Sequence, residues 1–418
     1  MADGSGRRLS PAWILVILTG LNLFNYVDRY VLSAVVGQIK KEFTLDDAKV
    51  GWLTTAFMLG YFLTSPFFGY LGDRMARKWL VALGIFVWSL GTVLTGFAHS
   101  YREVVLYRVM VGVGEASYAT LSPGLLSDAF GPERRNNAFT IFYVAIPIGA
   151  ALGVMIGSWI GEHYGWHYAF IWTGAPGLFL ALVLLPFEEP ARGEAEGKAG
   201  SAEFETKPTV RDIAGLLRIR DYNLVVWGYV AYTFALGAYA AWAPEFLRRV
   251  HHMTQVDAGN FFGAVMVVAG LFGTFLGGFA ATWWHKRNAA AYALMSGLSV
   301  LVATPLTFLV VTAASTPLVK ASMAGAIFLL FLSTGPVNTL TIESAPGNLR
   351  ASAIAGQIFL IHAFGDLWSP TIVGSVSAAA GDNLSKGLAV TPWALAIAAG
   401  LWLILAAVTL RGKRKPVA

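Results

Sequence analysis

Charged side chains stand in stretches of the sequence that are otherwise apolar. Asp28 and Arg29 are adjacent in LNLFNYVDRYVLSA, and Arg108 and Glu115 lie in LYRVMVGVGEASYATLSPGLLSD. A charge at mid-bilayer costs at least about 2.5–3.5 kcal/mol on insertion scales, so such residues usually pair with one another or mark a path for protons or substrates. A carboxyl group in a poorly hydrated site retains its proton more readily, whereas an arginine opposes this and can itself bind an anion. Asp28, Arg108 and Glu115 therefore predict a site at which proton binding and anion binding are coupled.

The spacing of these residues predicts how they lie relative to one another. Arg108, Gly112 and Glu115 are spaced by four and three residues, so they share one helix face. At about 1.5 Å per residue, Asp28 lies roughly 24 Å from the cytoplasmic side and Arg108 roughly 8 Å from the opposite side. In a hydrocarbon core about 30 Å thick, the two residues are therefore at nearly the same depth. We therefore expect Asp28 to pair with Arg108, whereas Arg29, turned by about 100°, faces a different helix or extends outward. Glu115 is expected to lie deeper. A structural ion pair with another helix is the alternative for Arg108 and Glu115, and helix packing is the alternative for Gly112.

A second polar group is present in the C-terminal part of the chain. In GQIFLIHAFGDLWSPTIVG, His362, Asp366 and Ser369 are spaced by four and three residues and share one helix face. We interpret His362 as a substrate-binding residue and Asp366 as a further proton-coupling residue. The alternative is a His–Asp hydrogen bond that only holds helices together.

The elements that carry these residues are predicted to be membrane-spanning helices. Only 13% of the 418 residues are charged, whereas soluble proteins carry about 25%. A helix needs about 20 mostly apolar residues to cross the hydrocarbon core. Twelve segments meet this requirement, at residues 12–39, 48–71, 79–98, 103–128, 137–161, 166–187, 221–245, 256–284, 288–313, 319–343, 351–379 and 391–410. The prediction is an all-α membrane protein with twelve transmembrane helices.

The polar stretch 188–220 divides these segments into two groups of six. We interpret it as a cytoplasmic linker, with a short amphipathic helix at its end, between an N-terminal half (1–187) and a C-terminal half (221–418). Twenty Lys and Arg residues fall on the side of the termini and eight on the opposite side, which predicts that both termini are cytoplasmic. The N-terminus shows no cleavable signal peptide. Two six-helix halves in the same orientation, with substrate bound between them, are one architecture of secondary transporters.

Residue types that are missing from the sequence exclude several functions. The chain has no cysteine, so thiolate chemistry is excluded. It has no phosphate-binding G-x-x-x-x-G-K-[ST] loop and no metal-ligand spacing. We find no nucleophile–base constellation. We therefore expect no enzymatic activity, no metal, no cofactor and no nucleic-acid partner.

The loop GYLGDRMARK resembles the signature loop of the major facilitator superfamily. In that family the loop latches the cytoplasmic ends of the two halves and releases them during transport. The sequence departs from the family pattern at Ala76, where glycine is usual. A simple basic cytoplasmic loop is the alternative. The resemblance implies four gating residues, Gly69, Asp73, Arg74 and Arg77.

Nearly the whole chain is similar to the spinster family of that superfamily. The similar segments are NYVDRY, GVGEASYATLSPGLLSDAF, FYVAIPIGAALG, GPVN and QIFLIHAFGDLWSP. Spinster proteins transport lysophospholipids and sphingosine-phosphate-type lipids, with proton coupling proposed for several. The resemblance implies that Asp28, Arg108 and Glu115 are the charges of the transport cavity. The short loops are typical of a bacterial member, which would lie in the inner (plasma) membrane.

Together these observations predict a secondary active transporter for an amphipathic anionic lipid, a lysophospholipid or sphingosine-phosphate-like lipid, working by alternating access. Arg108 would bind the anionic head group, and Asp28 and Glu115 would exchange protons. We expect a monomer whose partners are the lipid or small amphipathic anion, protons and the bilayer. Two alternatives remain open. One is a proton symporter of a small organic or sugar-phosphate anion, and the other is a lipid-binding membrane receptor or scaffold.

Overall fold

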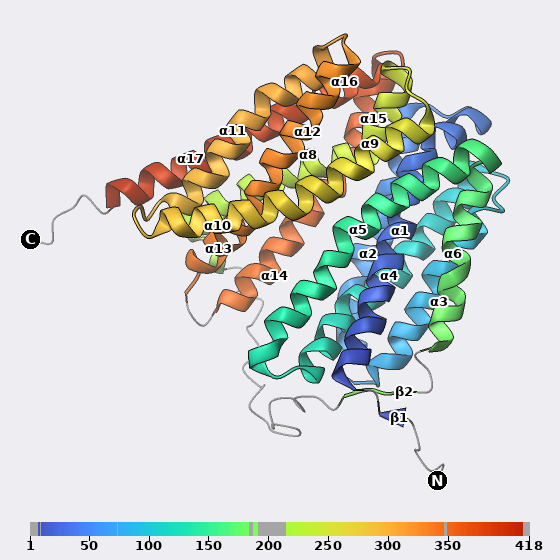
Figure 1. Cartoon of the computed structure of the whole chain (residues 1–418), viewed down its shortest axis with the longest axis horizontal. Coiled ribbons are helices and arrows are strands. Elements are labelled where there is room, and N and C mark those ends of the chain that lie inside the picture. The colour runs from blue at the N-terminus through green and yellow to red at the C-terminus, as the bar shows by residue number, and fades with distance from the viewer. Residues whose placement is uncertain are drawn as a thin grey trace, which may run out of the picture. The chain divides into compact units, whose positions relative to one another are not determined.

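The computed structural model describes residues 7–8, 10–72, 74–183, 187–190, 215–346 and 349–412, and Figure 1 labels their helices and strands. The N-terminal part is built from α1 (Pro11–Glu42), α2 (Asp47–Gly72), α3 (Arg77–Thr95), α4 (Tyr101–Ala129), α5 (Pro132–Tyr164) and α6 (Trp166–Val183). These helices lie within five residues of the first six predicted segments at each end.

The C-terminal part is also helical. Its elements are α8 (Arg220–Val250), α9 (Gln255–Val268), η3 (Ala269–Gly273), α10 (Thr274–His285), α11 (Ala291–Thr312), α12 (Thr316–Leu332), α13 (Thr334–Glu343), α14 (Arg350–Ile361), η5 (His362–Asp366), α15 (Ser369–Ala379), α16 (Leu384–Leu388) and α17 (Thr391–Gly412). The segments η3 and η5 are π-helical turns inside longer helices, a feature often found at functional sites. Most of the predicted linker lies outside the described residues.

Among the described residues, the departure from an all-α fold is one pair of very short strands. β1 (Arg7–Arg8) and β2 (Phe187–Glu188) pair in parallel over two residues each. The structure thus joins the start of the chain to the segment that follows α6.

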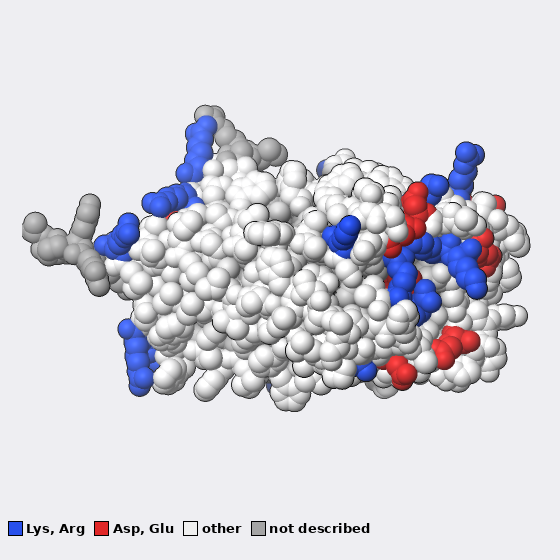
Figure 2. All heavy atoms as spheres, turned by 90° about the horizontal axis from the view of Figure 1, so that it is seen from above, with Lys and Arg blue, Asp and Glu red and all other residues white. Residues whose placement is uncertain are grey.

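Eight helices of the described chain are long and apolar enough to cross a membrane. They are Pro11–Glu42, Arg77–Thr95, Ala138–Tyr164, Arg220–Val250, Gln255–His285, Ala291–Thr312, Thr316–Glu343 and Leu384–Arg411. Helix α4 has the length but not the composition, because its charged, serine and glycine residues lower its hydropathy. Figure 2 shows that most of the surface on this face belongs to uncharged residues.

Local sequence explains where the two helices with intramembrane charges begin. Ser10 caps α1, with its hydroxyl accepting from the Trp13 amide, and a proline occupies the first helical turn. Ser100 caps α4 and accepts from the Glu103 amide at 3.3 Å. Such caps satisfy amide groups that the first helical turn leaves free.

The described chain divides into two compact units. Unit 1 comprises residues 1–45, 52–205 and 253–263, and unit 2 comprises residues 46–51, 206–252 and 264–418. The first turn of α2 therefore packs with unit 2, and the first turns of α9 pack with unit 1. The four charges that the sequence singles out in α1 and α4 belong to unit 1, whereas His362 and Asp366 belong to unit 2.

Two of the eight basic residues counted on the side opposite the termini are Arg248 and Arg249. Both form ion pairs within unit 2. Arg249 Nη2 lies 2.5 Å from Asp47 Oδ2, and Arg248 Nη2 lies 2.8 Å from Glu245 Oε1. Asp47 also accepts a hydrogen bond from the Ser377 hydroxyl at 2.5 Å. Both arginines are neutralised by carboxylates. They therefore weigh less against the predicted orientation than a count of Lys and Arg residues on each side of the membrane suggests.

Within unit 1, helices α2 and α4 approach each other closely through glycine. A Cβ atom added at Gly112 would lie 2.0 Å from the Phe57 carbonyl oxygen and 2.8 Å from the Tyr61 nitrogen. One added at Gly60 would lie 2.5 Å from the Val109 oxygen. Gly112 therefore serves helix packing, which was the simpler of its two predicted roles.

We expect Gly112→Ala to lower the melting temperature of the protein, because α4 would have to move away from the α2 backbone. Overpacking of this kind costs typically 1–3 kcal/mol. The matched control is Gly20→Ala, because no atom lies within 4 Å of a Cβ added there. Both substitutions replace glycine by alanine inside a helix, so both gain helix propensity. The difference between their melting temperatures therefore reports the packing effect alone. Equal melting temperatures for the two variants would contradict the close packing of α2 and α4.

Candidate functional site

Asp28 and Arg29 of α1 lie in the interior of unit 1 together with Arg108 and Glu115 of α4. Asp28 and Arg108 are each 1% exposed, and Glu115 is fully buried. The Arg29 side chain is 21% exposed, so it is the most accessible member of the group. We call these four residues the charge cluster.

The ion pair within the charge cluster forms between Arg29 and Glu115. Arg29 donates to Glu115 Oε2 from Nη2 at 2.6 Å and from Nε at 3.0 Å. Charge-assisted hydrogen bonds of this kind are short and about twice as strong as neutral ones. The expectation that Arg29 faces a helix other than that of Arg108, or extends outward, is wrong, because Glu115 and Arg108 both lie on α4. That Arg29 binds Glu115 was not predicted.

The predicted pair between Asp28 and Arg108 is wrong. Asp28 Oδ1 and the Nε and Nη1 atoms of Arg108 are buried and form no hydrogen bond within the described chain. Asp28 lies beside Thr173 of α6 and Trp88 of α3, close enough to Arg108 and Glu115 for their charges to interact. Successive residues of a helix point about 100° apart. Asp28 and Arg29 therefore contact different neighbours although they are adjacent in the chain.

Several polar atoms of the charge cluster have no protein partner. Besides Asp28 Oδ1 and the two Arg108 nitrogens, Glu115 Oε1 is buried without a hydrogen bond in the described chain. Leaving a buried donor or acceptor unsatisfied costs about 1–3 kcal/mol, and more for charged groups. The site therefore has both acceptors for a proton and donors for an anion. Among the described residues, its ion pair joins Arg29 and Glu115.

In unit 2, His362 and Asp366 are brought together as the sequence predicts. His362 Nδ1 lies 3.0 Å from each carboxylate oxygen of Asp366, inside the π-helical turn η5. Both side chains are partly exposed. Ser369, on the same predicted face, has a buried hydroxyl with no hydrogen bond in the described chain. The His–Asp bond is made within one helix, so it does not itself hold two helices together.

The predicted gating residues have separate environments. Arg77 is buried, and its Nη1 lies 2.7 Å from Asp128 Oδ2 at the end of α4. Arg74 is exposed, with its guanidinium 3.5 Å from the centre of the Tyr70 ring. Gly69 lies in the last turn of α2, and Asp73 lies outside the described residues. The gating role of these four residues stays a prediction.

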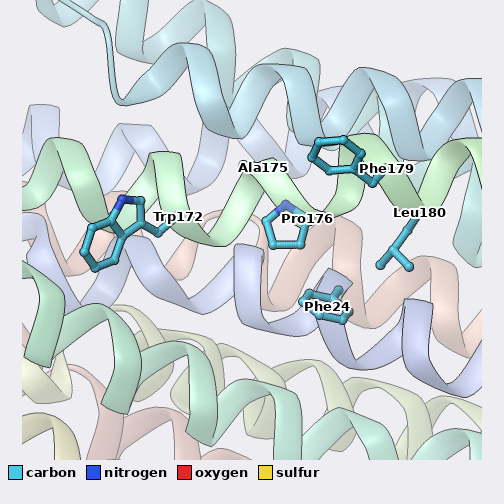
Figure 3. A pocket seen from close by; sticks show the side chains of 6 residues that line it. All are labelled: Phe24, Trp172, Ala175, Pro176, Phe179 and Leu180. Carbon is cyan, nitrogen blue, oxygen red and sulfur yellow. The ribbon is translucent and has the colours of Figure 1, made fainter.

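An apolar groove is present on unit 1 between α1 and α6 (Figure 3). It has a volume of about 500 Å³ and is lined by Phe24, Trp172, Ala175, Pro176, Phe179 and Leu180. Phe24 lies one helical turn before Asp28, but the groove itself has only apolar side chains. It suits hydrocarbon and offers no partner for a charged group, so the charge cluster remains the candidate site.

Comparison with known proteins identifies the family of this chain. The sequence profile of the Major Facilitator Superfamily matches residues 18–370. Protein spinster of Drosophila melanogaster is 33% identical over 390 residues, which are 90% of this chain and 63% of the fly protein. The sphingosine-1-phosphate transporter SPNS2 of Danio rerio is 32% identical over 92% of this chain and 78% of its own length.

Solved structures agree with this assignment at the level of the fold. The crystal structure of a bacterial homolog of the human lysosomal transporter spinster, inward-facing and unoccupied, has a TM-score of 0.87 at 23% identity and covers 99% of this chain and 100% of its own. The occupied form of that homolog has a TM-score of 0.83 at 24% identity, with the same coverage. The chain therefore belongs to the spinster family of the major facilitator superfamily, whose members are transmembrane transporters and not enzymes.

Proposed function

We propose that this protein transports an amphipathic anionic lipid, of the lysophospholipid or sphingosine-phosphate type, and that protons drive the transport. The observation that carries this proposal is the buried Arg29–Glu115 ion pair beside Arg108, whose Nε and Nη1 have no acceptor in the described chain. The lipid class is supported by the relative named as a sphingosine-1-phosphate transporter.

The proposed coupling follows from competition for Arg29. While Glu115 is ionised, its carboxylate occupies the Arg29 guanidinium. Protonation of Glu115 removes that negative charge, so Arg29 becomes available to an anion that reaches its exposed part. Arg108 then contributes further donors to the head group, as predicted from the sequence, and Asp28 provides a second carboxyl group for a proton. A bound anion and an ionised Glu115 therefore exclude each other.

The remaining assignments complete this proposal. The twelve apolar segments of the sequence support twelve spans. Both termini would lie in the cytoplasm, as the excess of basic residues on that side supports. The halves 1–187 and 221–418 would be joined by the linker 188–220. His362 would contact substrate and Asp366 would assist in proton coupling, while Gly69, Asp73, Arg74 and Arg77 would gate the cytoplasmic side. We place the protein as a monomer in a bacterial inner membrane.

Uptake into liposomes is the direct test of this function. Purified protein should accumulate a labelled lysophospholipid or sphingosine-phosphate-type lipid when a pH gradient is imposed, and it should only equilibrate the lipid without one. Protein-free liposomes give the background rate of lipid flip. Accumulation of a small organic or sugar phosphate but no lipid would favour a small-anion symporter. Binding without any uptake would favour a receptor or scaffold.

A further inference from the structure

The ring of Phe57, on α2, lies against both arginines of the charge cluster. The Arg108 guanidinium carbon lies 4.8 Å from the centre of the Phe57 ring, and that of Arg29 lies 5.0 Å from the same centre. Phe57 is on α2 and is 1% exposed. A guanidinium within about 6 Å of a ring centre is attracted by the negative face of the ring.

Two further rings complete the surroundings of Arg29. Its guanidinium carbon lies 4.8 Å from the centre of Tyr26 and 5.4 Å from that of Tyr61. We call Tyr26, Phe57 and Tyr61 the aromatic cage. Arg108 contacts only Phe57 among these rings in the described structure.

The backbone around Phe57 explains why its ring is held in this place. The Phe57 carbonyl oxygen lies where a Cβ of Gly112 would be, so α2 touches the α4 backbone one turn beyond Arg108. The ring has little freedom to move, because it is buried where three helices supply its neighbours. Phe57 therefore contacts two like charges that come from two different helices.

We propose that Phe57 is a positioning residue, which holds Arg29 and Arg108 side by side for one anionic head group. This inference rests on the proposed function. The ring replaces part of the hydration that both cations lose on burial, and it does so without a negative charge that would compete with the substrate. When Glu115 releases Arg29, the aromatic cage keeps the guanidinium beside Arg108, so the anion meets two cations already in place. Preorganisation of this kind raises affinity because less ordering is needed on binding.

The test replaces Phe57 by phenylalanine with one, two and three ring fluorines, which progressively weakens the negative face while changing the ring's size little. The full-length protein is used throughout. We expect the lipid concentration for half-maximal uptake to rise stepwise, reaching about tenfold for the trifluorinated ring, which corresponds to about 1.4 kcal/mol. The melting temperature without substrate should fall along the same series. The maximal rate should change less than the half-saturating concentration.

The matched control is the same fluorine series at Phe170 of α6. Phe170 is also fully buried in unit 1, and its ring lies 6.0 Å from the Trp166 ring. No cation lies over the Phe170 ring in the described chain. The proposal would be overturned if the half-saturating lipid concentration did not change with the number of fluorines at Phe57. It would also be overturned if that concentration changed equally for fluorination at Phe57 and at Phe170. A falling melting temperature with an unchanged half-saturating concentration would also overturn it, because Phe57 would then only stabilise the fold. If the unsubstituted protein shows no uptake, the proposed function is wrong. Separately, melting temperatures that do not change with fluorination at Phe57, or that change equally at Phe57 and Phe170, would contradict the contact between Phe57 and the arginines.

Discussion

Replacing Glu115 by glutamine is expected to abolish accumulation driven by a pH gradient while leaving exchange of labelled for unlabelled substrate intact. Glutamine keeps the size of the side chain and an oxygen that can accept from Arg29, but it cannot exchange a proton near neutral pH. Without a proton on Glu115 to gain and lose, anion binding at Arg29 no longer depends on the proton gradient. The measurement is uptake into liposomes with and without an imposed gradient, next to counterflow at equal pH.

The size of this effect follows from the energy of the gradient. One pH unit is worth about 1.36 kcal/mol for each coupled proton, which can sustain about a tenfold concentration ratio. The Glu115→Gln protein should reach a ratio of about one under the same gradient, because substrate would only equilibrate. The control is Glu103→Gln, on the same helix but in its first turn, where the carboxylate accepts from the His99 amide. Accumulation that persists in the Glu115→Gln protein would restrict Glu115 to a structural partner of Arg29.

Helix positions could be predicted from the sequence, because long apolar segments bounded by caps and basic residues carry a strong signal. The predicted segments 12–39 and 103–128 correspond to α1 and α4, which the structure extends by one to three residues at each end. The depth of each charge along its helix followed from the rise per residue. It correctly placed the charges of the two helices at comparable levels, where they interact.

The partners of those charges could not be predicted, because spacing along one helix does not give the helix's rotation relative to its neighbours. Asp28 and Arg29 differ by about 100° in direction, and either could have faced α4. The outcome depends on close packing, such as that of Gly112 against α2, which involves residues distant in the sequence. Depth alone favoured Asp28 with Arg108, whereas packing directs Arg29 toward Glu115.

The aromatic cage was missed for a different reason. Phe, Trp and Tyr make up 13% of the chain, so no single ring stands out by residue type. Phe57 becomes notable only when two arginines from other helices lie against it. The π-helical turn at His362 is equally invisible in the sequence, because a spacing of four residues would place His362 and Asp366 on one face of an ordinary α-helix as well.

Removal of the Arg29 guanidinium should strongly weaken substrate binding. A single substitution of Arg29 would leave Glu115 as a buried charge without a partner, so it is not a suitable test. Breaking a buried pair by removing one partner is itself strongly destabilising, by about 3–5 kcal/mol. We therefore compare Glu115→Gln with the double variant Arg29→Gln/Glu115→Gln, in which neither charge remains. The single variant should bind the anion at least as tightly as the unsubstituted protein, because no carboxylate competes for Arg29.

The double variant should lose about 2 kcal/mol or more of binding free energy, which is about a 30-fold lower affinity, because a charge-assisted contact with the head group is gone. Binding is measured by titrating a fluorescent lysolipid and by substrate-dependent shifts in melting temperature. The matched control adds Arg102→Gln to Glu115→Gln, since Arg102 is an exposed arginine near the start of α4. If the double variant binds as tightly as the single one, the anion does not bind at Arg29. Arg108→Gln in the same background would then decide whether it binds at Arg108, where the two buried nitrogens still lack an acceptor.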